Sequence, residues 1–100
     1  LLPYAVYILK CSDGSYYTGL STNIDNRIKA HRTGKIKSTR SRLPVALIHT
    51  SLFIDKKKAY NFKRYLQTSS GIAFRNKRFI VNSNLRLRYI HRDSVKISSY

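Results

Sequence analysis

Apolar residues gather in short runs along this chain, and the first two runs predict β-strands. Residues 4–11 and 15–21 are rich in aromatic and β-branched side chains, which favour strands. The segment between them, Ser12–Gly14, is typical of a hairpin turn, because its glycine adopts positive φ at little cost. We therefore expect the chain to open with a β-hairpin.

The length of the hairpin loop decides which side chains share a face. A two-residue turn would pair Lys10 with Tyr17 and place Tyr7 and Tyr17 on opposite faces. A three-residue loop with its glycine in the left-handed conformation would instead pair Leu9 with Tyr17 and Tyr7 with Gly19. We favour this second register, which puts both tyrosines on one face.

Helical spacing follows the hairpin. Thr22 and Asn23 are favourable N-cap residues, and the positions after them predict a helix over 23–34. At roughly 100° per residue, four side chains fall on one side of this helix: Ile24, Arg27, Ile28 and His31. The isoleucines would anchor the helix on the sheet, so Arg27 and His31 should point towards the sheet as well.

The second half of the chain predicts one more strand and two helices. A basic loop ends at Pro44, and residues 45–53 form the longest apolar run, a third strand. Asp55 should cap a helix over 56–67. Its apolar stripe consists of Ala59, Phe62 and Leu66. Ser69–Gly71 should break that helix before a short one over 72–78, and the extension 80–100 contains a strand-like run, LRLRYIH.

Composition limits the classes of protein to consider. One hundred residues allow one domain, expected over 1–79, and no segment approaches the roughly 20 apolar residues of a membrane span. The lone Cys11 rules out an internal disulfide, and the histidines are too scattered for a zinc site. The chain opens at Leu1 rather than methionine, so targeting cannot be read from it.

Charge is the strongest compositional signal. Twenty Lys and Arg residues stand against four acids, all aspartates, which gives a net charge of +16. Self-repulsion on this scale destabilises a small fold unless a polyanion binds it, and we expect that partner to be nucleic acid rather than a membrane. The cations expected to contact phosphates lie in the basic loop and in the last two helices: Lys35, Lys37, Arg40, Arg42, Lys63, Arg64, Arg75, Lys77 and Arg78.

The favoured register brings Tyr7, Tyr17, Arg27 and His31 together from two strands and one helix. A phenol can relay a proton when a neighbouring cation lowers its pKa, and an arginine can hold a phosphate through paired hydrogen bonds. Such a set suits phosphodiester chemistry. Aromatic residues in strands also commonly serve packing alone, and the four residues do not decide between these interpretations.

The stretch AVYILKCSDGSYYTGLSTNIDNRIKAH resembles the GIY-YIG endonuclease superfamily. Ala5–Tyr7 stands at the GIY position, Tyr17–Gly19 at the YIG position, and Thr39–Pro44 is similar to the TR…RP segment of the small single-domain bacterial branch. The similarity covers residues 4–79. It implies an α+β fold in which a three-stranded antiparallel sheet is flanked by helices.

The resemblance also implies roles for individual residues. The family's general-base tyrosine falls on Tyr17 with Tyr7 as its partner, its phosphate-stabilising arginine on Arg27, and the auxiliary histidine of this branch on His31. Its metal-binding glutamate falls on Lys63. An ammonium cannot ligate the magnesium that such enzymes use, so we expect no cofactor here unless the chain is an endonuclease after all.

Three hypotheses remain open. The first is a catalytically degenerate domain that binds nucleic acid, with RNA preferred, as a structural part of a ribonucleoprotein such as an organellar ribosome. The second is a metal-dependent DNA endonuclease in which Lys63 is an inactivating change. The third is a protein-binding relic without a nucleic-acid partner. The charge of +16 and the complete lack of glutamate favour the first.

Overall fold

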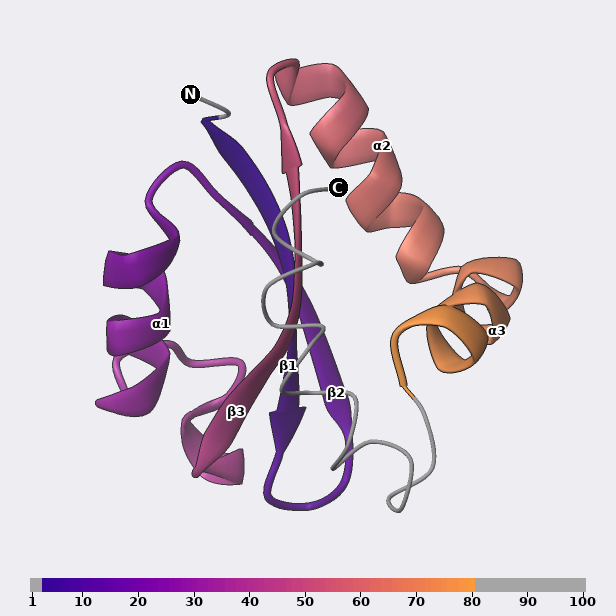
Figure 1. Cartoon of the computed structure of the whole chain (residues 1–100). Helices are drawn as coiled ribbons and strands as arrows, with labels where there is room; N and C mark the ends of the chain where they lie inside the picture. Colours follow the sequence, from indigo (N-terminus) through magenta and orange to yellow (C-terminus); the bar gives the residue numbers. More distant parts are fainter. Residues whose placement is uncertain (1–2, 81–100) are drawn as a thin grey trace.

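A computed structural model describes residues 3–80 of the chain. Its sheet has three antiparallel strands in the order β2-β1-β3. Figure 1 shows α1 on one side of this sheet and α2 and α3 on the other. The strands and helices follow one another along the chain: β1 (Tyr4–Cys11), β2 (Tyr16–Ser21), α1 (Ile24–Arg32), a 3-10 turn (Arg40–Arg42), β3 (Val45–Phe53), α2 (Lys56–Leu66) and α3 (Ser69–Arg78). The predicted α+β class is confirmed.

The hairpin has the register that places both tyrosines together. Leu9 pairs with Tyr17, and Tyr7 pairs with Gly19. Gly14 has φ of +86°, which is the left-handed conformation that the three-residue loop requires. The N–H of Gly14 donates to the carbonyl of Cys11 at 3.0 Å, which closes the turn.

Each face of the sheet has its own hydrophobic cluster. On the α1 side, Tyr7 and Leu9 of β1 pack with Ile28 of α1. On the other side, Val6 and Ile8 of the same strand pack against α2 and α3. Because successive side chains of a strand point to opposite faces, β1 supplies alternate residues to the two clusters. The central strand thus separates the α1 side from the face that α2 and α3 cover.

A β-bulge lets β3 contribute to both clusters. Leu9 pairs with Leu47 and Ile8 pairs with His49, so Ile48 is the extra residue on β3. Before the bulge, Val45 packs on the α1 side. After it, His49 lies opposite Ile8, on the α2–α3 side. Side-chain alternation alone would have kept these odd-numbered positions on one face.

The helix boundaries agree with expectation except around α3. Helix α1 is shorter than the predicted 23–34, because Asn23 caps it by accepting from the N–H of Asn26 at 3.2 Å. Helix α2 is capped by Asp55 as expected, through the N–H of Lys57 at 3.0 Å. The prediction of a 72–78 helix after a break at Ser69–Gly71 was wrong at its start.

Helix α3 begins at Ser69, because Thr68 is its N-cap. The Thr68 hydroxyl accepts a hydrogen bond from the N–H of Gly71 at 3.1 Å, so the predicted breaker is the first turn of the helix. Gly71 is required here for packing. An added Cβ would lie 1.6 Å from the Tyr65 carbonyl oxygen.

The strand-like run of the C-terminal extension lies outside the described residues. Within residues 3–80, no helix has the length and apolar character that a membrane crossing requires.

Candidate functional site

Three aromatic side chains converge on the α1 side of the sheet. Tyr7 comes from β1, Tyr17 from β2 and His31 from the last turn of α1. The ring centroids of Tyr17 and His31 are 5.1 Å apart, and those of Tyr7 and His31 are 5.7 Å apart, both in edge-to-face geometry. The two tyrosine rings are 6.2 Å apart. Both phenols and the imidazole of the predicted set therefore form one group.

A chain of hydrogen bonds runs through this group. The Tyr7 hydroxyl lies 2.8 Å from Nε2 of His31, and Nδ1 of His31 lies 2.7 Å from the Thr39 hydroxyl. All three side chains are fully buried. Sequence reasoning did not select Thr39. The one sequence feature that pointed to Thr39 was its place in the TR…RP segment. That segment is irregular, so no periodicity predicts that a residue eight positions after His31 lies next to it.

Arg27 brings the positive charge of the site. It is half-buried on α1, and its interaction with the Tyr7 hydroxyl raises the pKa of the guanidinium. The Nε atom is buried, and it has no hydrogen-bond partner among residues 3–80. Because that atom is closed to solvent, an external acceptor oxygen would bind the accessible part of this half-buried side chain.

Burial fixes the protonation states of the other members. It raises the pKa of Tyr7, and the nearby Arg27 opposes this only in part. Burial, together with the charge of Arg27, lowers the pKa of His31. At neutral pH Tyr7 and His31 are therefore neutral beside one cation, Arg27. This charge balance suits a bound anion.

Gly19 makes room for the Tyr7 ring. An ideal Cβ on Gly19 would lie 2.3 Å from Cζ and 2.4 Å from the hydroxyl oxygen of Tyr7. These two residues are direct partners across the hairpin. The glycine of the second motif thus has a packing role, because any side chain there would displace the phenol from His31.

The basic residues expected to bind phosphate fall into two groups. Lys35, Lys37 and Arg40 are exposed on the segment that carries Thr39. Arg42 in the same segment is half-buried and already engaged, since it donates to the Ser15 hydroxyl at 2.6 Å and to the Ser38 carbonyl at 2.8 Å. Arg42 therefore has a structural role in addition to any contact with a partner.

The second basic group lies on the helices that cover the other face of the sheet. Lys63 is half-exposed on α2. The three arginines lie over aromatic rings: Arg64 over Tyr60, Arg75 over Tyr16 and Arg78 over Phe74, at 5.9, 4.7 and 5.8 Å from the ring centroids. Lys77 is exposed on α3. None of these residues makes a described contact with Tyr7, Tyr17, Arg27 or His31.

The donor set does not fit a hard divalent cation. Magnesium prefers carboxylate and water oxygens, whereas this group offers phenols, an imidazole, a hydroxyl and a guanidinium. No three His, Cys, Asp or Glu side chains come together anywhere in residues 3–80. The position at which the family resemblance implies a glutamate is Lys63, which lies on α2 and offers no ligand oxygen.

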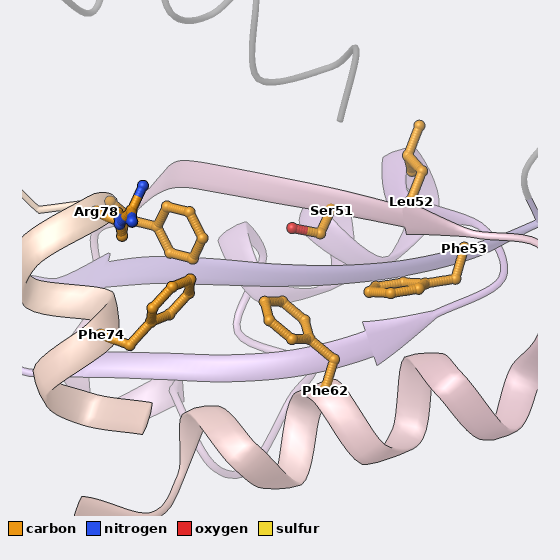
Figure 2. Close-up of a pocket in the computed structure, with 7 residues that line it drawn as sticks. Ser51, Leu52, Phe53, Phe62, Phe74 and Arg78 are labelled. Carbon is orange, nitrogen blue, oxygen red and sulfur yellow. The ribbon is translucent and has the colours of Figure 1, made fainter. Parts of the chain in front are cut away.

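The α2–α3 face also contains a cavity of about 320 Å³. Figure 2 shows the rings of Phe53, Phe62 and Phe74 around it, with Arg78 at one end. Phe79 and Ser51 complete much of the lining. Among residues 3–80, Arg78 is the only charged residue of this lining, so these residues give the cavity no pair of groups for acid–base chemistry. The candidate site is therefore the Tyr7–His31 group.

Comparisons with known proteins agree with the motifs. The GIY-YIG catalytic domain matches residues 3–78. UPF0213 protein CPE1444 of Clostridium perfringens is 36% identical over 96 residues, which cover 95% of this chain and 90% of that protein. UPF0213 protein SAG0778 of Streptococcus agalactiae is 46% identical over 59 residues, or 58% of this chain and 67% of that protein.

One solved structure is also similar in sequence. The solution NMR structure of the UPF0213 protein BH0048 from Bacillus halodurans is 45% identical, with 64% of this chain and 69% of that chain covered and a TM-score of 0.43. The extent of the domain match and the identity to the Clostridium protein over nearly the whole chain establish the relationship. This chain belongs to the GIY-YIG family.

Proposed function

We propose that this chain binds the sugar–phosphate backbone of nucleic acid at the Tyr7–His31 group and does not cleave it by the family's metal-dependent route. The observation that carries the proposal is the half-buried Arg27, the cation of this group, which interacts with both phenols. A phosphate oxygen would pair with the accessible part of that side chain, and the net charge of +16 would draw the rest of the backbone to the surface.

Each residue has a definite part in such binding. Arg27 offers paired N–H donors to one phosphate. Tyr17 is half-buried, and its hydroxyl can donate to a second oxygen, while Tyr7 is held by His31. Lys35, Lys37 and Arg40 lie on the segment that contacts His31 through Thr39, where they can meet the neighbouring phosphates. Binding of this kind requires no metal ion.

RNA within a ribonucleoprotein is the partner we favour. The phosphates of folded RNA around the chain would offset the repulsion between its many lysines and arginines. This part of the proposal is based on charge alone, since the relatives named above come from bacteria and their names state no partner. An organellar ribosome is one setting of this chemistry. Competition between RNA and DNA of the same sequence for one labelled strand would separate the two partners.

The binding proposal is tested by fluorescence anisotropy with a labelled RNA hairpin at several salt concentrations. The unaltered chain should give a steep negative slope of log affinity against log salt. Arg27→Gln should weaken binding about tenfold, because one hydrogen bond to a charged group contributes a binding free energy of about that size. Arg27→Lys should restore little, because it keeps the charge without the paired donors.

Lys29→Gln is the matched control, because Lys29 is exposed on the same helix. It should weaken binding less than Arg27→Gln does. Equal effects of the two substitutions, or a flat salt dependence, would contradict binding of phosphate at the Tyr7–His31 group.

A second candidate function is metal-dependent cleavage of DNA. The intact grouping of Tyr7, Tyr17, Arg27 and His31 favours it, and Lys63 opposes it. Plasmid and branched DNA, incubated with magnesium and either the unaltered chain or Lys63→Glu, distinguish the two functions. Cleavage by the unaltered chain would overturn the proposal above. Cleavage by Lys63→Glu alone would identify Lys63 as the change that silences the site.

A further inference from the structure

Thr39 lies at the closed end of the hydrogen-bond chain that leads to Tyr7. Its side chain is fully buried, and its hydroxyl lies 2.7 Å from Nδ1 of His31. Within residues 3–80, that hydroxyl makes no other hydrogen bond. The opposite nitrogen of the imidazole, Nε2, lies 2.8 Å from the Tyr7 hydroxyl. The imidazole therefore connects two hydroxyl groups, and the position of its proton determines which of them donates.

The neutral form of His31 has two possible proton arrangements. In the first, the Thr39 hydroxyl donates to Nδ1, and the N–H at Nε2 donates to the Tyr7 oxygen. In the second, the N–H at Nδ1 donates to Thr39, and the Tyr7 hydroxyl donates to Nε2. The second leaves the hydrogen of a fully buried threonine without an acceptor, which proteins rarely tolerate. The first satisfies both hydrogen bonds of the imidazole, and it leaves the hydrogen of the buried Tyr7 hydroxyl for the neighbouring Tyr17 oxygen, with which Tyr7 also interacts.

We propose that Thr39 is a positioning residue, which holds His31 in the Nε2–H tautomer and so makes the Tyr7 oxygen a hydrogen-bond acceptor. The hydrogen of the Tyr7 hydroxyl is then not taken up by His31. It is directed to the Tyr17 oxygen, so the half-buried Tyr17 keeps its own hydroxyl hydrogen for a ligand oxygen beside Arg27. The tautomer itself follows from the buried contacts alone. The consequence for the ligand rests on the proposed function, in which that oxygen belongs to a phosphate.

The surroundings of His31 support a neutral imidazole. Tyr7 faces it from β1, Tyr17 faces it from β2, and Arg27 lies on its own helix. None of these groups is a carboxylate, and the cation next to His31 disfavours a second positive charge. The tautomer, rather than protonation of the ring, therefore controls the direction of the hydrogen bonds.

Nitrogen NMR of the histidine ring tests this inference without any nucleic acid. In ¹⁵N-labelled protein at pH 7.5, His31 should show a protonated Nε2 and an unprotonated Nδ1, which long-range ¹H–¹⁵N correlations distinguish. Thr39→Val keeps the shape of the side chain but removes its hydroxyl. It should shift the population towards the Nδ1–H form. Thr39→Ser is the matched control and should retain the original pattern.

The pKa of Tyr7 gives a second measurement, from the ¹³Cζ shift of selectively labelled tyrosine. Loss of the Nε2–H donor removes a group that stabilises the phenolate, so Thr39→Val should raise the pKa of Tyr7 above that of the unaltered chain. Thr39→Ser should leave it unchanged. A variant that merely loosens the packing would admit water and shift this pKa in the opposite direction.

Two results would overturn the inference. One is an Nδ1–H tautomer in the unaltered chain, a measurement that does not depend on whether Thr39→Val folds. The other is a folded Thr39→Val variant with the original tautomer and the original pKa of Tyr7. Failure of the anisotropy experiment on Arg27 would refute phosphate binding and leave the tautomer result standing, so the two proposals fail separately.

Discussion

Substitution of Gly19 by alanine tests whether the second motif glycine exists to accommodate Tyr7. The φ of Gly19 lies outside the left-handed region, so an alanine can adopt the same backbone and the substitution reports on space alone. Its Cβ would lie 2.3 Å from Cζ of Tyr7. Carbon atoms in contact stay roughly 3.5–4.0 Å apart, so the ring would need to move by about 1 Å.

The ring has nowhere to move without loss of other contacts. Tyr7 is fully buried against Leu9 and Ile28, and its hydroxyl is bonded to His31. Overpacking of a core costs about 1–3 kcal/mol, and loss of the hydrogen bond adds roughly 1 kcal/mol. We therefore expect Gly19→Ala to lower the free energy of unfolding by about 2–4 kcal/mol. For a domain of this size, that change lowers Tm by roughly 10–25 °C.

Urea unfolding followed by far-UV circular dichroism measures this loss, with two controls. Gly14→Ala meets no atom within 4 Å and carries only the strain of φ +86°, so it should cost about 1 kcal/mol. In a Tyr7→Ala background the clash is absent, and Gly19→Ala should then cost much less than in the unaltered chain. An equal cost of Gly19→Ala in both backgrounds, or a cost under about 0.5 kcal/mol, would refute the reasoning.

Three further predictions concern the α2–α3 side. Gly71→Ala should destabilise the chain by more than about 2 kcal/mol in urea unfolding, because its Cβ would lie 1.6 Å from the rigid Tyr65 carbonyl; a change below 0.5 kcal/mol would contradict this contact. Asp55→Ala should cost about 1 kcal/mol through loss of the cap on Lys57, while Asp55→Asn should cost much less. The third prediction concerns pH: burial lowers the pKa of His49 to about 4, so the stability of the folded chain should depend on pH.

The pH dependence follows from the sign of that shift. The unfolded chain binds the proton near pH 6.5 and the folded chain only near 4, so the stability due to neutral His49 is complete above 6.5 and is lost as the pH falls towards 4. The loss should be roughly 3 kcal/mol at most. Unfolding curves of His49→Gln over this range should be flatter than those of the unaltered chain. Parallel curves would contradict a buried neutral histidine.

Local chemistry was enough to predict the hairpin and the helix caps. The Ser12–Gly14 turn and the period of two left two registers open, of which the favoured one, joining Tyr7 to Gly19, is confirmed; Asp55 marked the start of α2. The start of α3 was wrong, because Ser69 and Ser70 read as a loop when the cap contributed by Thr68 is overlooked. Polar residues of this kind favour caps and turns alike, so sequence alone does not separate the two.

The candidate site was predictable where it lies on regular elements. Tyr7, Tyr17, Arg27 and His31 follow from strand alternation and helical spacing, once the register is known. Thr39 was missed because it reaches His31 from an irregular segment, whose path no periodicity determines. The role of Arg42 was missed for the same reason: its partners, Ser15 and Ser38, belong to two different loops.

Those loop contacts have a consequence for the energetics of association. Three hydrogen bonds hold the segment after α1 in place. They join Thr39 to His31, Arg42 to Ser15, and the N–H of Ser12 to the Arg42 carbonyl at 2.9 Å. The backbone of this segment is therefore ordered before any partner arrives. A polyanion that binds there immobilises side chains but not the chain itself, so it avoids the roughly 1–2 kcal/mol per residue that ordering a free backbone costs. The affinity of this surface should consequently owe much to preorganisation, and tight binding should be possible over a small contact area.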